Sequence, residues 1–145
     1  MLCYTGGTHF SAGLIDKQEQ LYRQGSQETI EGLRGLQRLA YEMKDALLTG
    51  DLWSFGDVLG VSWEQKRRMN PEVTNERIDE MYAAARKNGA LGGKLLGAGG
   101  GGYLLLFSPL GHKRTIREKL ERLGGQFTDF AFVEEGLQTW RSNCL

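Results

Sequence analysis

Residues 97–102 are five glycines and one alanine between two apolar segments. Glycine has no side chain and readily adopts positive φ, so successive backbone amides in such a loop can converge on an anion. The same property lets another peptide chain approach closely. Ordering four consecutive glycines is entropically costly, and a bound group would offset that cost. A phosphate is the ligand that suits this loop, and a loose hairpin turn is the simpler alternative.

The flanking sequence excludes two phosphate-binding motifs. No GKS or GKT follows the loop, so it is not a Walker loop. The glycines do not stand between a strand and a helix, as the dinucleotide-binding fingerprint requires. The loop instead leads into residues 103–107, an apolar run typical of a buried strand. We therefore predict a β-hairpin joined by glycines.

Basic side chains elsewhere offer a second kind of chemistry. Lys66, Arg67 and Arg68 are consecutive at the end of a helical pattern and could bind a sugar phosphate through charge-assisted hydrogen bonds. A solvated helix end is the alternative. Lys94 either points into a substrate cleft from its strand or lies on the solvent face of an edge strand.

The aromatic and sulfur-containing residues do not indicate another site. Trp53, Trp63 and Trp140 could stack on a sugar, but large aromatics on such faces are typical of packing. Cys3 and Cys144 lie near opposite ends of the sequence and lack zinc-site spacing. We expect both to be free thiols.

The spacing of apolar residues predicts the elements that precede the loop. Residues 2–4 predict a strand, and a helix is expected from about Thr8 to Gly25. The clearest helix spans residues 26–49, with Ser26 as its N-cap and Gly50 as its left-handed end. Its expected apolar stripe is Ile30, Leu33, Leu36, Ala40, Met43 and Leu47.

Two further helices are predicted before the hairpin. Asp51 is expected to cap a helix over residues 52–69. Thr74 or Asn75 is expected to cap a shorter helix that Gly89 terminates.

Residues 94–96 and 103–107 then form the hairpin, followed by a helix over residues 113–123. An aromatic-rich strand is expected to begin near Phe127 and to include Phe130, Phe132 and Val133. This order predicts an α+β fold: a ferredoxin-like split βαββαβ antiparallel sheet with helices on one face and an expanded helical crossover.

Length and composition are those of a single globular domain. The chain has 145 residues, of which 40% are hydrophobic and 25% charged, with a formal net charge of zero. This balance gives no field that would hold nucleic acid or an anionic membrane. With no leader and no apolar run of about 20 residues, we expect a soluble, cytoplasmic protein.

Three segments carry a resemblance to a known family. GGKLLGAGGGGYLLLF resembles the third conserved motif of the GHMP kinases, a superfamily that includes galactokinase, homoserine kinase and mevalonate kinase. LCYTGGTHFSAG and LGVSWEQKRRMNPEVTNERID, together with the loop, resemble the heptose 7-phosphate kinase branch, and the fucokinase C-terminal region is next. The similarity spans nearly the whole chain.

The resemblance implies that residues 1–145 form the C-terminal domain of a sugar kinase, and that the N-terminal ATP-binding domain is missing from this sequence. It implies transfer of the γ-phosphoryl group of ATP, with Mg²⁺, to a sugar or sugar phosphate, with heptose 7-phosphate first. The cofactor-binding residues would be Gly97, Ala98, Gly99, Gly100, Gly101 and Gly102. The substrate-binding residues would be Thr5, Gly6, His9, Lys66, Arg67 and Lys94, although many relatives have Arg in place of His9.

Two other classes of function compete with this interpretation. A stand-alone ferredoxin-like ligand-binding or regulatory module would need no second domain, because fold does not fix activity. An RNA-recognition domain ranks last, because it needs exposed aromatics in a basic strand motif, and the strand after the loop offers Tyr103 with no positive charge in its favour. If the kinase interpretation holds, we expect the isolated chain to be inactive and able to associate with itself.

Overall fold

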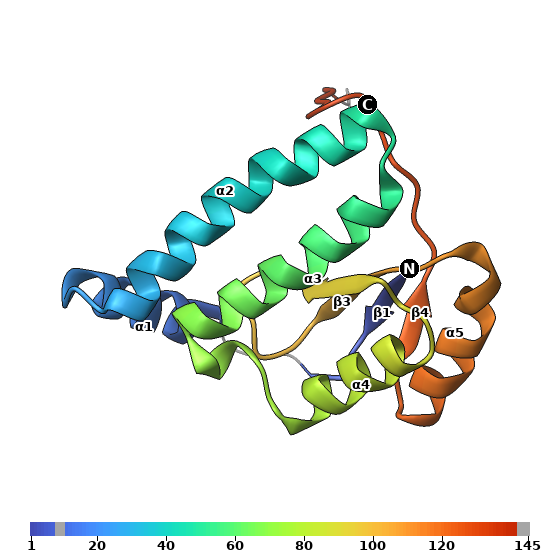
Figure 1. Ribbon diagram of the computed structural model, residues 1–145, viewed down its shortest axis with the longest axis horizontal. Coiled ribbons are helices and arrows are strands. Elements are labelled where there is room, and N and C mark those ends of the chain that lie inside the picture. Colours follow the sequence, from blue (N-terminus) through green and yellow to red (C-terminus); the bar gives the residue numbers. More distant parts are fainter. Residues whose placement is uncertain (8–10, 142–145) are drawn as a thin grey trace.

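The computed structural model describes residues 1–7 and 11–141, and Figure 1 shows their arrangement. The elements in chain order are β1 (Leu2–Tyr4), α1 (Ser11–Arg23), α2 (Gln27–Thr49), α3 (Leu52–Met69), η1 (Pro71–Val73), α4 (Glu76–Lys87), β2 (Gly92–Leu95), β3 (Tyr103–Phe107), η2 (Leu110–His112), α5 (Lys113–Arg122) and β4 (Gln126–Thr128). The predicted order of strands and helices is confirmed.

The four strands form one antiparallel sheet in the order β2-β3-β1-β4. β3 lies between β1 and β2, so β1 and β2 run parallel to each other without touching. This is the split βαβ arrangement predicted from the sequence. Helices α1 to α4 all belong to the crossover from β1 to β2, which is the expected expansion.

The core lies between one face of the sheet and the helices α4 and α5 (Figure 1). Side chains alternate along β3, so Leu104 and Leu106 are buried while Tyr103 is exposed on the opposite face. The buried set is Cys3, Leu95, Leu104 and Leu106 from the sheet, Ile78, Met81 and Ala85 from α4, Ile116 and Leu120 from α5, Trp63 from α3, Val73 from η1, and Ala90 between α4 and β2.

Helix α3 packs against the edge strand β2 through glycine. A Cβ atom on Gly92 would lie 1.9 Å from the carbonyl oxygen of Gly56, and one on Gly60 would lie 3.5 Å from the Cα of Gly92. The helix backbone can approach the strand this closely only because side chains are absent there. The long α2 runs antiparallel to α3 (Figure 1).

The predicted caps are confirmed. The side chains of Ser26 and Asp51 accept hydrogen bonds from backbone amides in the first turns of α2 and α3. Gly50 ends α2 with a φ of 73°, the left-handed conformation that glycine favours. Asn75 rather than Thr74 caps α4 by accepting from the amide of Ile78 at 3.0 Å.

The last strand is shorter than the aromatic run suggested. β4 ends at Thr128, which pairs with Leu2, the first residue of β1 in the ladder. Among the described residues, no strand of the sheet lies opposite the next positions, and Phe130, Phe132 and Val133 are exposed and outside regular structure. The prediction of an extended strand there was wrong, because the length of β4 is limited by the length of its pairing partner β1.

Two predictions about apolar packing were also partly wrong. The buried positions of α2 are Thr29, Gly32, Leu39 and Ala46, whereas Ala40 and Leu47 of the expected stripe are exposed. Small residues lie at this contact because a Cβ on Gly32 would lie 2.3 Å from Met69 Cγ. Of the three tryptophans, Trp63 is buried, whereas Trp53 and Trp140 are 63% and 84% exposed.

Within the described residues, no helix combines the length and the apolar character needed to cross a bilayer.

Candidate functional site

The glycine loop, defined as residues 97–102, joins β2 to β3 and depends on glycine for its backbone conformation. The positive φ values are 70° at Gly97, 126° at Gly99, 74° at Gly100 and 96° at Gly102. Residues with a Cβ rarely adopt such angles, because the side chain then crowds the following carbonyl. The run of glycines is therefore required by the shape of the loop.

The loop packs against two other segments of the chain. The amide of Gly100 donates to the carbonyl of Val73 in η1 at 2.7 Å, and the amide of Gly102 donates to the carbonyl of Gly7 at 2.8 Å. A Cβ on Gly99 would lie 2.6 Å from Val73 Cβ, and one on Gly101 would lie 2.4 Å from the Gly7 oxygen. The loop is thus held between η1 and the turn after β1.

The remaining loop amides are the ones that a ligand could use. Among the described residues, the amides of Gly97, Ala98, Gly99 and Gly101 have no hydrogen-bond acceptor on the protein. Four backbone donors in one short loop are therefore left available to an anion. Two of the six predicted cofactor-binding residues, Gly100 and Gly102, use their amides to hold the loop in place.

Thr5 supports the loop from β1. Its amide and its hydroxyl both donate to the carbonyl of Gly102, at 2.8 and 2.9 Å, and its side chain is buried. The carbonyl of Thr5 in turn accepts from Arg77 Nε at 2.7 Å. Gly6 follows with a φ of 83°, and His9 lies outside the described residues.

Lys66 is buried at the start of the loop, so its side chain is not part of a solvated helix end. Its ammonium group donates to the carbonyl of Leu95 at 3.2 Å and to the carbonyl of Gly97. Burial, with a smaller effect from the charge on nearby Lys94, lowers the pKa of Lys66 to about 8. Burial also lowers the pKa of half-buried Lys94.

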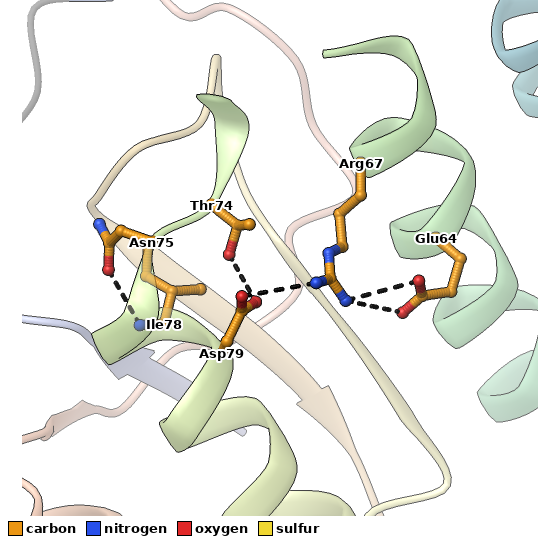
Figure 2. Close-up of polar contacts among 6 residues, drawn as sticks. All are labelled: Glu64, Arg67, Thr74, Asn75, Ile78 and Asp79. Atoms are coloured by element: carbon orange, nitrogen blue, oxygen red, sulfur yellow. Dashed lines mark hydrogen bonds and ion pairs between the residues drawn. The ribbon is translucent and has the colours of Figure 1, made fainter. Parts of the chain in front are cut away.

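The side chain of Arg67 points toward two acidic partners, as Figure 2 shows. Its guanidinium lies 3.4 Å from Glu64 on the same helix and 3.4 Å from Asp79 of α4. Asp79 also accepts a hydrogen bond from the Thr74 hydroxyl at 2.8 Å. The positive charge of Arg67 is therefore largely neutralised, and its contacts join α3 to α4.

Residues at the start of α4 also support the loop, and the sequence did not mark them for that role. Asn75 caps the helix with its Oδ1 while its Nδ2 donates to the carbonyl of Gly100 at 3.0 Å. Arg77 joins Thr5 to the carbonyl of Gly124. The capping pattern identified Asn75, but nothing local in the sequence indicates where its second donor goes.

The residues that contact the loop are Thr5, Gly7, Lys66 and Asn75, with Lys94 close to Lys66. Surface cavities of 550, 470 and 330 Å³ are lined by other segments. No group of three or more His, Cys, Asp or Glu side chains suited to a metal occurs among the described residues.

A family model described as "GHMP kinases C terminal" matches residues 43–126, more than half of the chain. A D-glycero-alpha-D-manno-heptose 7-phosphate kinase of Campylobacter jejuni is 32% identical over 117 residues, covering 81% of this chain and 34% of that protein. A bifunctional fucokinase/GDP-fucose pyrophosphorylase of Arabidopsis thaliana is 26% identical over 122 residues, covering 83% of this chain and 12% of that protein.

The fold has counterparts of known structure. The L. major mevalonate kinase, crystallised with R-mevalonate, superposes with a TM-score of 0.75 at 21% identity. The match covers 83% of this chain and 37% of that one. At this identity the likeness concerns the fold alone. In all three comparisons the chain spans little more than a third of the relative's length or less.

Proposed function

Because this chain belongs to the GHMP kinase C-terminal family, we propose that it is the substrate-side domain of an ATP-dependent sugar kinase. The acceptor is a sugar or sugar phosphate, with heptose 7-phosphate first, since a kinase of that sugar is 32% identical to the chain. An N-terminal kinase domain outside residues 1–145 supplies most contacts to the nucleotide.

The loop amides carry the proposal. Those of Gly97, Ala98, Gly99 and Gly101 have no protein acceptor among the described residues. Hydrogen bonds to Val73 and Gly7 hold the same loop rigidly. A rigid set of unpaired donors suits the phosphates of ATP, because no reorganisation is needed when the anion binds. Phosphoryl transfer depends mainly on such positioning and on charge neutralisation.

Bound Mg²⁺ would neutralise charge on the transferring phosphoryl group. Its ligands are carboxylate oxygens, water and phosphate, and the described residues around the glycine loop supply backbone amides and lysines instead. We therefore assign the metal ligands and the acceptor of the substrate proton to the N-terminal domain. This chain orients the phosphates and forms the substrate wall.

The proposal is tested by phosphotransfer assays on the full-length polypeptide that contains this chain. Heptose 7-phosphate, L-fucose and mevalonate would be offered with ATP and Mg²⁺. Turnover is expected with a sugar acceptor. If none of the three acceptors is phosphorylated, the assignment as a sugar kinase is overturned. If mevalonate alone is phosphorylated, the substrate class must be corrected.

A matched pair of glycine variants tests the role of the loop. Gly101→Ala places a methyl group against the Gly7 oxygen, and we expect it to lower kcat/KM by about 10- to 100-fold through misplaced amides. Gly111→Ala is the control, because a Cβ there meets no atom within 4 Å. Equal activity of the two variants would contradict a role for the loop.

The separated chain distinguishes the kinase domain from an independent module. Alone, residues 1–145 are expected to show negligible phosphotransfer. Isothermal titration of this chain against ATP and heptose 7-phosphate should show much weaker binding than the full-length polypeptide. Full affinity in the separated chain would favour the ligand-binding module instead.

A further inference from the structure

Lys66 holds the point at which the chain leaves the sheet and enters the glycine loop. Its ammonium group donates to the carbonyls of Leu95, the last residue of β2, and Gly97, the first residue of the loop. These two carbonyls flank Leu96, whose amide donates to Tyr103 across the hairpin at 2.8 Å. One side chain from α3 therefore holds the backbone on both sides of Leu96, where the strand passes into the loop.

Among the described residues, this ammonium group donates to carbonyl oxygens and forms no ion pair with a carboxylate. On its own helix, Glu64 pairs with Arg67, and from α4 Asp79 does the same. From α2, Glu31 pairs with Arg68 at 3.6 Å. The charged group that β2 contributes is Lys94, which repels Lys66. Glu72 of η1 is exposed.

We propose that Lys66 is a positioning residue that sets the direction of the glycine loop, an inference that rests on the proposed function. It does so through its two backbone contacts and not by binding a substrate phosphate. Without these contacts, the carbonyls of Leu95 and Gly97 lose a charge-assisted donor. The unpaired amides of the glycine loop then lose their fixed orientation. Lys66 thereby acts on the nucleotide through the loop.

Arg86 provides a matched control at the opposite end of the same strand. Its Nη1 donates to the carbonyl of Ala90 at 3.0 Å and to that of Leu91, just before β2 begins. It is thus also a cation from a helix that binds backbone carbonyls beside β2, but it lies at the end of the strand away from the loop. Arg86→Met should remove a comparable contact without affecting the loop.

Amide hydrogen exchange of the full-length polypeptide gives a readout that does not require activity. In the peptide covering residues 97–102, Gly100 and Gly102 carry the hydrogen-bonded amides, and in Lys66→Met we expect these two to exchange about tenfold faster than in the parent protein. Lys66→Arg should restore much of the protection, because it keeps the cation and its donors. Arg86→Met should leave the exchange of this peptide unchanged.

Kinetics complete the test. For Lys66→Met the KM for ATP should rise at least about tenfold with the KM for the sugar nearly unchanged. Unchanged loop exchange in Lys66→Met, or an equal increase in Arg86→Met, would overturn the positioning role. A larger rise in the sugar KM would favour direct substrate binding instead. Altered exchange in a protein without phosphotransfer would preserve the loop anchor and refute only the kinase function.

Discussion

Thr5 directs both its amide and its hydroxyl to one acceptor, the carbonyl oxygen of Gly102. The pair lies 97 residues apart in sequence and joins the end of β1 to the end of the glycine loop. Thr5→Val keeps the shape and the amide bond but removes the hydroxyl donor. We expect the free energy of unfolding to fall by about 1 kcal/mol, measured by urea denaturation.

The control for this variant is Thr128→Val on exposed β4. Its stability should stay within about 0.5 kcal/mol of the parent value. Equal losses in the two variants would show that the Thr5 hydroxyl contributes nothing specific.

The contact between α3 and β2 predicts a large effect at a single glycine. In Gly92→Ala the new methyl group would lie 1.9 Å from the Gly56 oxygen, so the helix must move away from the strand. We expect a loss of about 1–3 kcal/mol or more in the free energy of unfolding. Gly13→Ala, on α1 with open space around it, should be neutral or slightly stabilising. A neutral Gly92→Ala would contradict this packing.

The lowered pKa of Lys66 predicts how stability depends on pH. Above about pH 8 the folded chain releases a proton that the unfolded chain keeps up to its ordinary pKa of 10.5, so folding becomes more favourable as pH rises. Urea midpoints between about pH 8 and pH 9 should therefore rise more in the parent protein than in Lys66→Met. Lys94 shifts in the same direction but is present in both proteins.

The slope in this window cannot exceed about 1.4 kcal/mol per pH unit for one proton. Above pH 9 the buried Cys3 thiol works in the opposite direction, because its raised pKa favours unfolding as pH increases. Parallel slopes in the parent and in Lys66→Met would show that the Lys66 pKa is not lowered by folding.

Cys3 should be unreactive in the folded protein. Its side chain has no exposed surface, and burial raises the pKa of its thiol to about 11, so little nucleophilic thiolate forms near neutral pH. In a Cys144→Ser background, iodoacetamide should label Cys3 only after denaturant is added, as followed by mass spectrometry. Rapid labelling of the native protein would show that β1 opens readily.

The sequence determined most of the elements because their signals are local. Ser26, Asp51 and Asn75 cap helices through hydrogen bonds to residues three positions ahead, so the caps can be recognised from a short stretch of sequence. The hairpin around the glycine loop was equally local. The length of β4 could not be predicted locally, because it depends on which residues of β1 are available to pair with it.

The arrangement of the candidate site was harder to predict. The glycine loop was identified from composition, but its contacts with Val73 and Gly7 bring together segments distant in sequence. Lys66 and Arg67 are adjacent in one basic cluster of the sequence. Lys66 nevertheless donates to backbone carbonyls, whereas Arg67 pairs with carboxylates. Neighbours on a helix point about 100° apart, so a cluster in sequence is not a cluster in space.

The glycine contact of α3 with β2 also affects how the protein behaves among copies of itself. A strand at the border of a sheet can recruit strands from other molecules, which leads to aggregation. On β2 that route is obstructed, because α3 covers the border and Lys66 and Arg86 bind backbone oxygens at its two ends. The opposite border, β4, has only three residues. Opening α3 away from β2 would therefore expose the longer border to intermolecular sheet growth.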